Sequence, residues 1–255
     1  MARYASYIIC TTSRTGSTLL CTMLSATGIA GNPDSYFHVP SLDRWAKQWN
    51  LRPLRSDPDA DLFRSVTAAV LKAGTANTDI FGLRLMRKSF GYLAQLLAAC
   101  DPGQPDDATR FKRAFGSPLY IHLTRGDKIA QAVSLLKATQ TGLWHAAPDG
   151  TEIERTAPPK QPTYDATLIA QHVAELCADD AAWGDWFERE NIQPLHLTYE
   201  DLAQDPQGTL TDILRRLGLE HARAGSIKPQ VAKLADKTSQ DWIAQFRACN
   251  SISDP

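Results

Sequence analysis

Residues 8–20 read IICTTSRTGSTLL, an apolar run followed by a short loop of small and polar residues and then a second apolar run. The first run is typical of a buried β-strand, and the second is typical of a helix. A strand, a tight loop and a helix N-terminus together form a cradle for anions, because unpaired backbone N–H groups and the helix dipole favour negative charge there. This stretch therefore predicts an α/β fold with an anion site.

The loop in this stretch supplies side-chain donors as well as backbone donors. Arg14 is planar and permanently charged, Gly16 lets the backbone approach an anion closely, and Ser17 and Thr18 add hydroxyls. The kinase motif GxxxxGK[ST] needs an early glycine and a lysine, and Thr11 and Ser17 occupy those positions here. The loop therefore has the geometry of a phosphate-binding loop, but a magnesium-dependent kinase is disfavoured. The alternative is an ordinary helix start with Ser17 as the N-cap.

Strand-like and helix-like patterns alternate along the chain. Strands are expected at residues 4–11, 79–86, 117–125 and 193–199. Helices are expected at residues 17–27, 41–51, 60–74, 89–100, 127–141, 164–190, 206–217 and 239–249. This order predicts parallel pairing through right-handed crossovers, and so a three-layer, P-loop-like α/β fold with a central, mainly parallel sheet flanked by helices. We expect one domain over residues 1–255, with a mobile segment at 147–162.

Composition limits the classes of function. The 255 residues are 43% hydrophobic and 22% charged, as in a soluble globular protein. A formal net charge of −1 provides no global field for nucleic acid or an anionic membrane, so an anion site must be local. No apolar run reaches the length of a membrane span. Five scattered cysteines without a CxxC favour reduced thiols and a cytoplasmic location over disulfides or a zinc site.

A second pair of anion ligands is expected near the third strand. Arg125 ends that strand and Ser134 follows nine residues later, in the next helix. Ligands bind at the carboxyl ends of parallel strands, where the first loop also lies. Arginine can donate two parallel hydrogen bonds to a phosphate, but Arg125 could equally be a surface ion-pair member and Ser134 a packing residue. Near the C-terminus, Lys237 lies either beside the ligand or on a solvated face.

Taken together and in this order, these segments resemble the bacterial sulfotransferase family that contains trehalose 2-sulfotransferase and the lipopolysaccharide-sulfotransferase-like proteins. The resemblance covers nearly the whole chain. It is densest in RTGSTLLCTMLSATGIAGNPDSYF, RGDKIAQAVSLLKATQTGLW, TYEDL and DKTSQDWIAQFR. It implies an enzyme that uses 3′-phosphoadenosine-5′-phosphosulfate (PAPS) as its sulfuryl donor, requires no metal and forms a homodimer.

The resemblance also implies the residues that bind the donor. Arg125 and Ser134 would hold the 3′-phosphate, and the segment around Lys237 would close over the nucleotide. Arg14 stands where many sulfotransferases have a lysine, so it would stabilise the leaving phosphate. The loop residues that would hold the 5′-phosphosulfate are Arg14, Thr15, Gly16, Ser17 and Thr18.

The general base departs from the family pattern. In the trehalose enzyme a glutamate precedes the aromatic pair in the loop after the first helix, and Ser35 takes that place in PDSYFH. Serine cannot act as a general base at neutral pH. Asp34 and His38 are the nearby candidates, since a histidine titrates close to neutrality. His38 also has a simpler interpretation as a hydrogen-bonding loop residue.

The acceptor is expected to be a hydroxyl of a carbohydrate, a glycolipid or a lipopolysaccharide-type molecule. Aromatic faces pack against sugar rings, and several aromatic residues follow the first helix. The same residues could equally belong to the core or to a dimer contact. The expected acceptor-binding residues are Ser35, Tyr36, Phe37 and Trp45.

Two other functions remain open from the sequence alone. A catalytically silent nucleotide-binding protein of the same fold would explain the missing glutamate at Ser35. A nucleotide-dependent phosphotransferase would share the loop, but it would need the lysine that Ser17 replaces.

Overall fold

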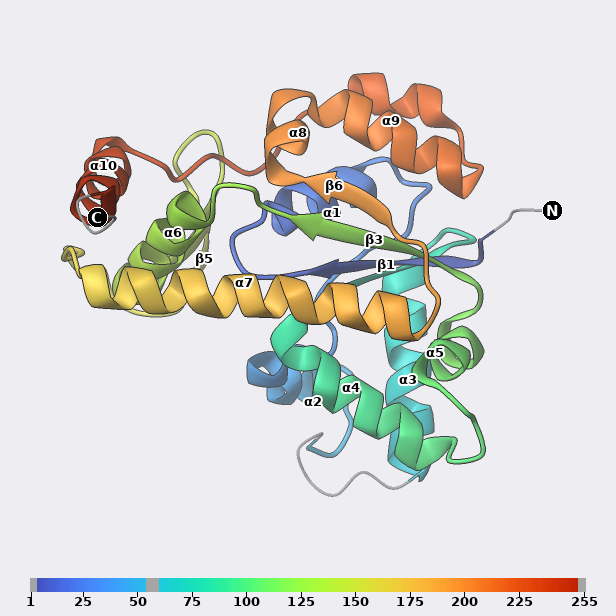
Figure 1. The fold of residues 1–255 in the computed structure, drawn as a ribbon. Coiled ribbons are helices and arrows are strands. Elements are labelled where there is room, and N and C mark those ends of the chain that lie inside the picture. The colour runs from blue at the N-terminus through green and yellow to red at the C-terminus, as the bar shows by residue number, and fades with distance from the viewer. Residues whose placement is uncertain (1–3, 54–59, 252–255) are drawn as a thin grey trace.

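A central sheet of four parallel strands organises the computed structural model, which describes residues 4–53 and 60–251 (Figure 1). The strand order is β2-β1-β3-β6, and every pairing within this sheet is parallel. The strands are β1 (Ser6–Thr11), β2 (Phe81–Met86), β3 (Pro118–Thr124) and β6 (Leu195–Thr198). The predicted parallel α/β fold is confirmed.

Helices cover both faces of the sheet. Figure 1 shows α1, α8 and α9 on one face, and α7 with α2 to α5 on the other. The α-helices are α1 (Ser17–Ala26), α2 (Leu42–Gln48), α3 (Ala60–Thr75), α4 (Arg87–Cys100), α5 (Asp107–Phe115), α6 (Lys128–Thr141), α7 (Ala166–Arg189), α8 (Tyr199–Gln204), α9 (Pro206–Leu217) and α10 (Lys237–Ser251). Two short 3₁₀ helices are η1 (Val39–Ser41) and η2 (His221–Ser226).

Strand β1 is buried on both sides, which explains its continuous apolar sequence. Ile8 and Cys10 pack into one core cluster with the aromatic residues of α4, α5 and α7, while Tyr7 and Ile9 pack into a second cluster against α1 and α9. Successive side chains of a strand point to opposite faces, so β1 joins the two cores. This arrangement gives the three layers expected from the sequence.

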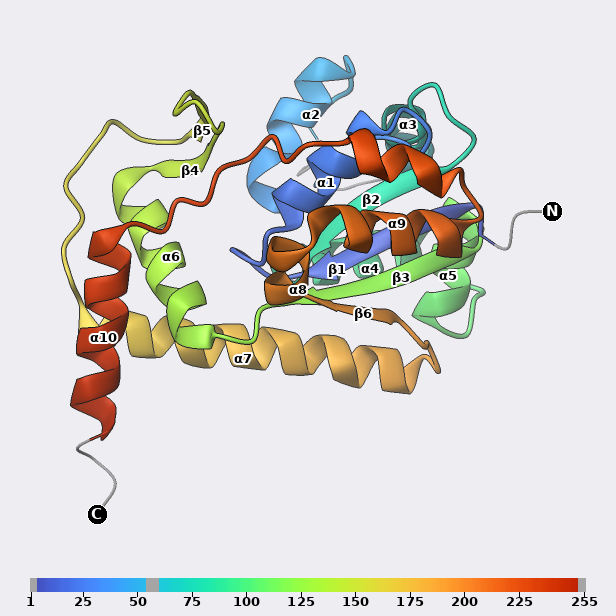
Figure 2. The same ribbon diagram turned by 90° about the horizontal axis from the view of Figure 1, so that it is seen from above.

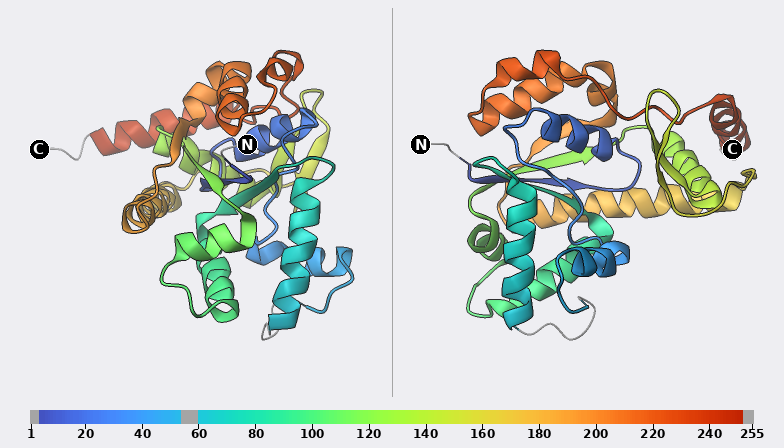
Figure 3. Two further views of the ribbon diagram at one scale, coloured as in Figure 1. Left: turned by 90° about the vertical axis from the view of Figure 1, so that its right-hand side faces the viewer. Right: turned by 180° about the vertical axis from the view of Figure 1, so that it is seen from behind.

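A third hydrophobic cluster extends the fold beyond the carboxyl ends of β1 and β3. Leu136 of α6, Leu176 of α7 and Trp242 of α10 belong to it. A short antiparallel hairpin of β4 (Leu143–Ala146) and β5 (Glu152–Arg155) lies on the same side (Figure 2). From two further directions, Figure 3 shows α10 standing apart from the sheet. These elements form a wall beside the strand ends.

Strands β4 and β5 and helices α5 and α8 were absent from the sequence-based expectation. Strand β5 lies within the segment 147–162, which was expected to be mobile. Helix α5 begins after Asp106, whose side chain accepts a hydrogen bond from the Thr109 N–H, and α8 begins after Thr198, which accepts one from the Asp201 N–H. Both N-cap residues are present in the sequence, but these helices are too short for their apolar periodicity to stand out.

No helix in the described part of the chain combines the length and the apolar character that crossing a bilayer requires. All five cysteines lie within this part and are free thiols.

Candidate functional site

The loop between β1 and α1 is held from beneath by hydroxyl and amide side chains. Thr11 Oγ1 donates to the Leu123 carbonyl at 2.8 Å and lies 2.6 Å from Thr15 Oγ1. Gln131, fully buried on α6, donates through Nε2 to Thr12 Oγ1 at 3.0 Å and to the Ser13 carbonyl at 2.7 Å. The loop is therefore tied to both β3 and α6.

An ion pair between α6 and α7 supports the same loop. Lys128 Nζ lies 2.5 Å from Asp180 Oδ2, and both side chains are largely buried. Lys128 also donates to the Arg125 carbonyl at 2.6 Å and to Gln131 Oε1 at 3.2 Å, while Thr12 Oγ1 donates to Asp180 Oδ1 at 3.3 Å. The Lys128–Asp180 pair thus joins the ends of β1 and β3 to α7.

The backbone of this loop differs in conformation from the strand and the helix on either side of it. Arg14 and Gly16 adopt left-handed backbone conformations, with φ of 66° and 78°. A Cβ on Gly16 would lie 2.8 Å from a ring carbon of Tyr199, so the close approach of that ring requires glycine. The backbone N–H groups of residues 14–18 donate to no other described residue. Consecutive N–H groups in such a turn form an anion-binding nest.

The structure brings Arg14, Arg125 and Ser134 together, although they come from three separate segments. Arg14 Nε donates to Ser134 Oγ at 2.9 Å, and its NH1 donates to the Trp144 carbonyl at 2.6 Å. Arg125 NH1 donates to the Arg14 carbonyl at 3.3 Å. Burial and then the nearby Arg125 charge lower the pKa of Arg14 to about 10, which leaves the side chain protonated at neutral pH. Two neighbouring cations give this part of the molecule a local positive charge.

Arg125 is positioned by α8. Its guanidinium lies 4.4 Å from the centroid of the Tyr199 ring, a cation–π arrangement. Glu200 accepts the backbone N–H groups of Gly126 and Asp127, at 3.0 and 3.3 Å, and so fixes the turn after Arg125. Arg125 Nε is buried and has no hydrogen-bond partner among the described residues. This guanidinium therefore retains donor capacity for a ligand.

Arg84 of β2 is a site residue that the sequence analysis did not identify. Its Nε donates to Ser35 Oγ at 2.7 Å, its NH1 to Thr18 Oγ1 at 2.7 Å, and its NH2 to Asp34 Oδ1 at 3.2 Å. A single guanidinium therefore joins the start of α1 to the loop that follows it. The only signal in the sequence was a charged residue inside the apolar strand FGLRLM.

His145 of β4 is a second site residue that the sequence analysis missed. Its Nε2 lies 3.0 Å from Thr18 Oγ1 and 3.5 Å from Glu154 Oε2 on β5. Burial, Arg14 and Arg84 lower the pKa of His145 to about 3, so the ring is neutral at neutral pH. The hairpin that carries both residues lies in a segment without a clear sequence signal.

The two candidate bases lie in different surroundings. The Arg84 backbone N–H donates to the Asp34 carbonyl at 3.1 Å, which fixes Asp34 alongside the edge strand β2. The Asp34 side chain is 39% exposed, so its carboxylate is open to solvent. His38 Nδ1 lies 3.4 Å from Ser89 Oγ at the start of α4, and burial and then Arg84 lower the pKa of His38.

The structure buries the aromatic residues that were expected to bind an acceptor. Tyr36 and Phe37 are 1% exposed and Trp45 is 7% exposed, because all three pack into the core with α2 and the aromatic residues beneath the sheet. Trp45 Nε1 donates to the Ser35 carbonyl at 3.2 Å. Ser35 itself is buried, and its hydroxyl is held by Arg84. The alternative interpretation as core residues is the one that fits these aromatic side chains.

Lys237 is also placed differently from the expectation. Its side chain is 86% exposed and forms an ion pair with Asp241 at 3.2 Å. It begins α10, whose Trp242 and Phe246 turn towards α6 and α7 and leave the first residue facing solvent. The structure therefore does not bring Lys237 to the loop.

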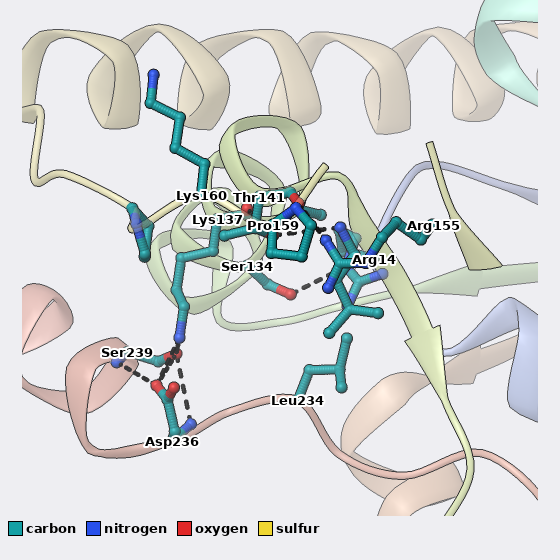
Figure 4. A pocket seen from close by; sticks show the side chains of 13 residues that line it. Arg14, Ser134, Lys137, Thr141, Arg155, Pro159, Lys160, Leu234, Asp236 and Ser239 are labelled. Atoms are coloured by element: carbon teal, nitrogen blue, oxygen red, sulfur yellow. Dashed lines mark hydrogen bonds and ion pairs between the residues drawn. The ribbon is translucent and has the colours of Figure 1, made fainter. Parts of the chain in front are cut away.

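A cavity of about 340 Å³ borders the contact between Arg14 and Ser134, and both residues line it (Figure 4). Its walls come from α6, the end of β5, the segment 159–162 and the segment leading into α10. This volume lies within the usual range for small-molecule sites. In the part of the chain that the structure describes, no group of three or more His, Cys, Asp or Glu residues could hold a metal ion.

Comparison with known proteins matches nearly the whole chain to one family. The model of the family described as Stf0 sulphotransferase matches residues 6–249. The chain is 29% identical over 262 residues to the trehalose 2-sulfotransferase of Mycolicibacterium smegmatis, covering 95% of this chain and 94% of that protein. It is 28% identical over 260 residues to the Mycobacterium tuberculosis protein of the same name, with the same coverage of 95% and 94%.

Two solved structures are also similar. A sulfotransferase from Alicyclobacillus acidocaldarius aligns with a TM-score of 0.45 and 16% identity, covering 98% of this chain and 93% of that one. The sulfotransferase domain of a Synechococcus olefin synthase aligns with a TM-score of 0.41 and 18% identity, covering 100% and 98%.

We predict that Gln131→Met lowers the free energy of unfolding by about 2 kcal/mol. The substitution keeps the side-chain length but removes two donated hydrogen bonds, each contributing about 1 kcal/mol, and a third accepted from Lys128, which keeps Asp180 as its partner. Urea unfolding measures the change. The control is Gln171→Met on α7, an exposed glutamine that contacts Glu175, for which the expected loss is about 0.3 kcal/mol. Equal losses for the two variants would contradict a supporting role for Gln131.

Proposed function

Because the chain belongs to the Stf0 sulphotransferase family, it is a sulfotransferase, and we propose that it transfers the sulfuryl group of PAPS to a carbohydrate hydroxyl. The observation that carries the proposal is the open row of N–H groups at residues 14–18, with Arg14 and Arg125 beside it. These groups suit a phosphosulfate and a second phosphate. Family membership decides against the phosphotransferase that the sequence left open.

The described residues fit the proposed donor. The loop 14–18 would hold the 5′-phosphosulfate through its N–H groups and through the Ser17 and Thr18 hydroxyls. Arg125 and Ser134 would hold the 3′-phosphate, and the unpartnered Nε of Arg125 supports this role. When bound, PAPS supplies the sulfuryl group and a nucleotide leaving group. The scheme requires no metal ion.

Arg14 would act on the leaving group. The proposed transfer would form a bond between the acceptor oxygen and sulfur and break the bond between sulfur and the bridging oxygen, so negative charge would be left on the nucleotide phosphate. A guanidinium already fixed by Ser134 and the Trp144 carbonyl stabilises that charge without reorganising. The N–H groups of the loop would assist it. Positioning and electrostatic stabilisation would supply most of the catalysis, as in phosphoryl transfer.

Asp34 is the better supported of the two candidate bases. Arg84 binds the Asp34 carboxylate and the Thr18 hydroxyl through neighbouring nitrogens, which places the carboxylate on the loop side of the site. Asp34 lies next to Ser35, the residue at the family's glutamate position. His38 is instead turned towards Ser89. Asp34 would take the acceptor proton, and His38 would support the loop.

The acceptor side of the proposed site is polar. Arg84 and His145 contact the Thr18 hydroxyl there, and the carboxylates of Asp34 and Glu154 lie beside them. The rings of Tyr36, Phe37 and Trp45 are buried. Hydrogen-bonding groups of this kind suit the hydroxyls of a sugar, a glycolipid or a lipopolysaccharide-type acceptor. The two relatives named trehalose 2-sulfotransferase support a carbohydrate. A homodimer and a cytoplasmic location form part of the same proposal, and the five free thiols are consistent with a reducing compartment.

Arg125→Ala is expected to weaken binding of 3′-phosphoadenosine-5′-phosphate (PAP) by about 2 kcal/mol, or about 30-fold, through loss of a charge-assisted contact. Binding of adenosine 5′-phosphate, which lacks the 3′-phosphate, should change by less than about threefold. Calorimetric titration of both nucleotides measures the difference. Equal losses for the two nucleotides would refute the assignment of Arg125 to the 3′-phosphate.

Asp34→Asn is expected to lower kcat by about 10²- to 10⁴-fold, the usual contribution of a general base, while PAP affinity stays within about twofold. The matched variant His38→Ala should retain kcat within about threefold. Sulfuryl transfer from PAPS to trehalose and related disaccharides provides the assay. Retention of kcat in Asp34→Asn, with a large loss in His38→Ala, would exchange the two roles.

A further inference from the structure

The cavity beyond Arg14 is lined by one face of α6. Ser134, Lys137, Ala138 and Thr141 all contribute to it, and their spacing of three, four and seven residues places them on one side of a helix. Ser134 contacts Arg14 at the inner end of this row. Lys137 lies one turn further along the same face (Figure 4).

The Lys137 ammonium is held at the cavity by the segment leading into α10. Its Nζ lies 2.5 Å from Asp236 Oδ1 and 2.8 Å from Ser239 Oγ. The Lys137 side chain is only 14% exposed, whereas Asp236 is 58% exposed. Asp236 is also the N-cap of α10, because its Oδ1 accepts the Ser239 N–H at 2.9 Å. Figure 4 shows the ammonium pointing at this carboxylate.

The cavity is cationic in a chain of formal net charge −1. Four of its lining residues are basic, namely Arg14, Lys137, Arg155 and Lys160, and one, Asp236, is acidic. Arg155 is paired with Glu152, and Figure 4 shows the Lys160 side chain extending away from the Lys137–Asp236 pair. Arg14 and Lys137 are therefore the two cations on either side of Ser134.

We propose that Lys137 binds the 3′-phosphate of the nucleotide donor together with Ser134, and that Asp236 competes with this phosphate for the ammonium. The proposal rests on the proposed function and names a specificity residue of the same site. It adds a second cation to the proposed Arg125 contact and places it on α6, where Ser134 already lies, rather than at the exposed Lys237. Two oxygens, one carboxylate and one hydroxyl, now occupy positions around Nζ that phosphate oxygens can take.

The competing carboxylate is ionised throughout the neutral range. Burial opposes ionisation, but the hydrogen bonds from Lys137 and from Ser239 lower the pKa of Asp236 to about 2. The competition is therefore electrostatic and insensitive to pH between about 5 and 8. Removing the negative charge at Asp236 should favour a phosphate on Lys137.

Four variants test the proposal by calorimetric titration with PAP and with adenosine 5′-phosphate. Lys137→Ala should weaken PAP binding by about 10- to 100-fold and leave adenosine 5′-phosphate within about twofold. Lys137→Arg, which keeps the charge, should restore much of the loss. Asp236→Asn retains a good N-cap for α10 and should tighten PAP binding by about two- to fivefold. The control, Lys237→Ala, should change neither nucleotide.

Asp236→Asn leaves Lys137 intact, so the proposal can be tested even if Lys137→Ala folds poorly. Unchanged PAP affinity in Lys137→Ala, or equal losses for both nucleotides, would overturn the role of Lys137. Weaker PAP binding by Asp236→Asn would overturn the competition. Failure of the unmodified protein to bind PAP would contradict the proposed function itself, and with it this inference.

Discussion

The loop after β1 must keep its backbone donors open, and the rest of the structure depends on that constraint. An unpaired buried N–H group costs about 1–3 kcal/mol, so an open nest of them persists only if the surrounding structure holds it in place. Gln131, Thr11 and the Lys128–Asp180 pair provide that support from β3, α6 and α7. The parallel sheet also supports the loop, because it brings the carboxyl ends of β1 and β3 together.

Charge is concentrated at this end of the sheet. Arg14, Arg84 and Arg125 gather around the loop in a chain with almost no net charge. Carboxylates surround the cluster: Asp34 and Glu200 fix the backbone and side chains on either side, and Asp236 holds Lys137. The cost of placing like charges together is lowered when an anion binds, so this arrangement would favour the proposed polyanionic donor. The positive electrostatic field of these arginines would therefore serve both donor recognition and catalysis.

Much of this site was predictable from the sequence, because local patterns fix local structure. The run IICTTSRTGSTLL specifies a strand, a loop and a helix start, and Arg125 stands where a strand visibly ends. Arg84 could not be found in this way, since its role follows from the register that pairs it with Ile9 beside the loop. Lys137 and Lys237 look alike in sequence, and only the packing of α10 separates them. The rings of Tyr36 and Trp45 suit either a sugar or a core, and burial decided for the core.

The most direct test is a calorimetric titration of the unmodified protein, first with PAP and then with ADP plus magnesium. We expect tight binding of PAP that does not depend on magnesium, and little or no binding of ADP. Binding of ADP with magnesium, without binding of PAP, would contradict the proposed donor site.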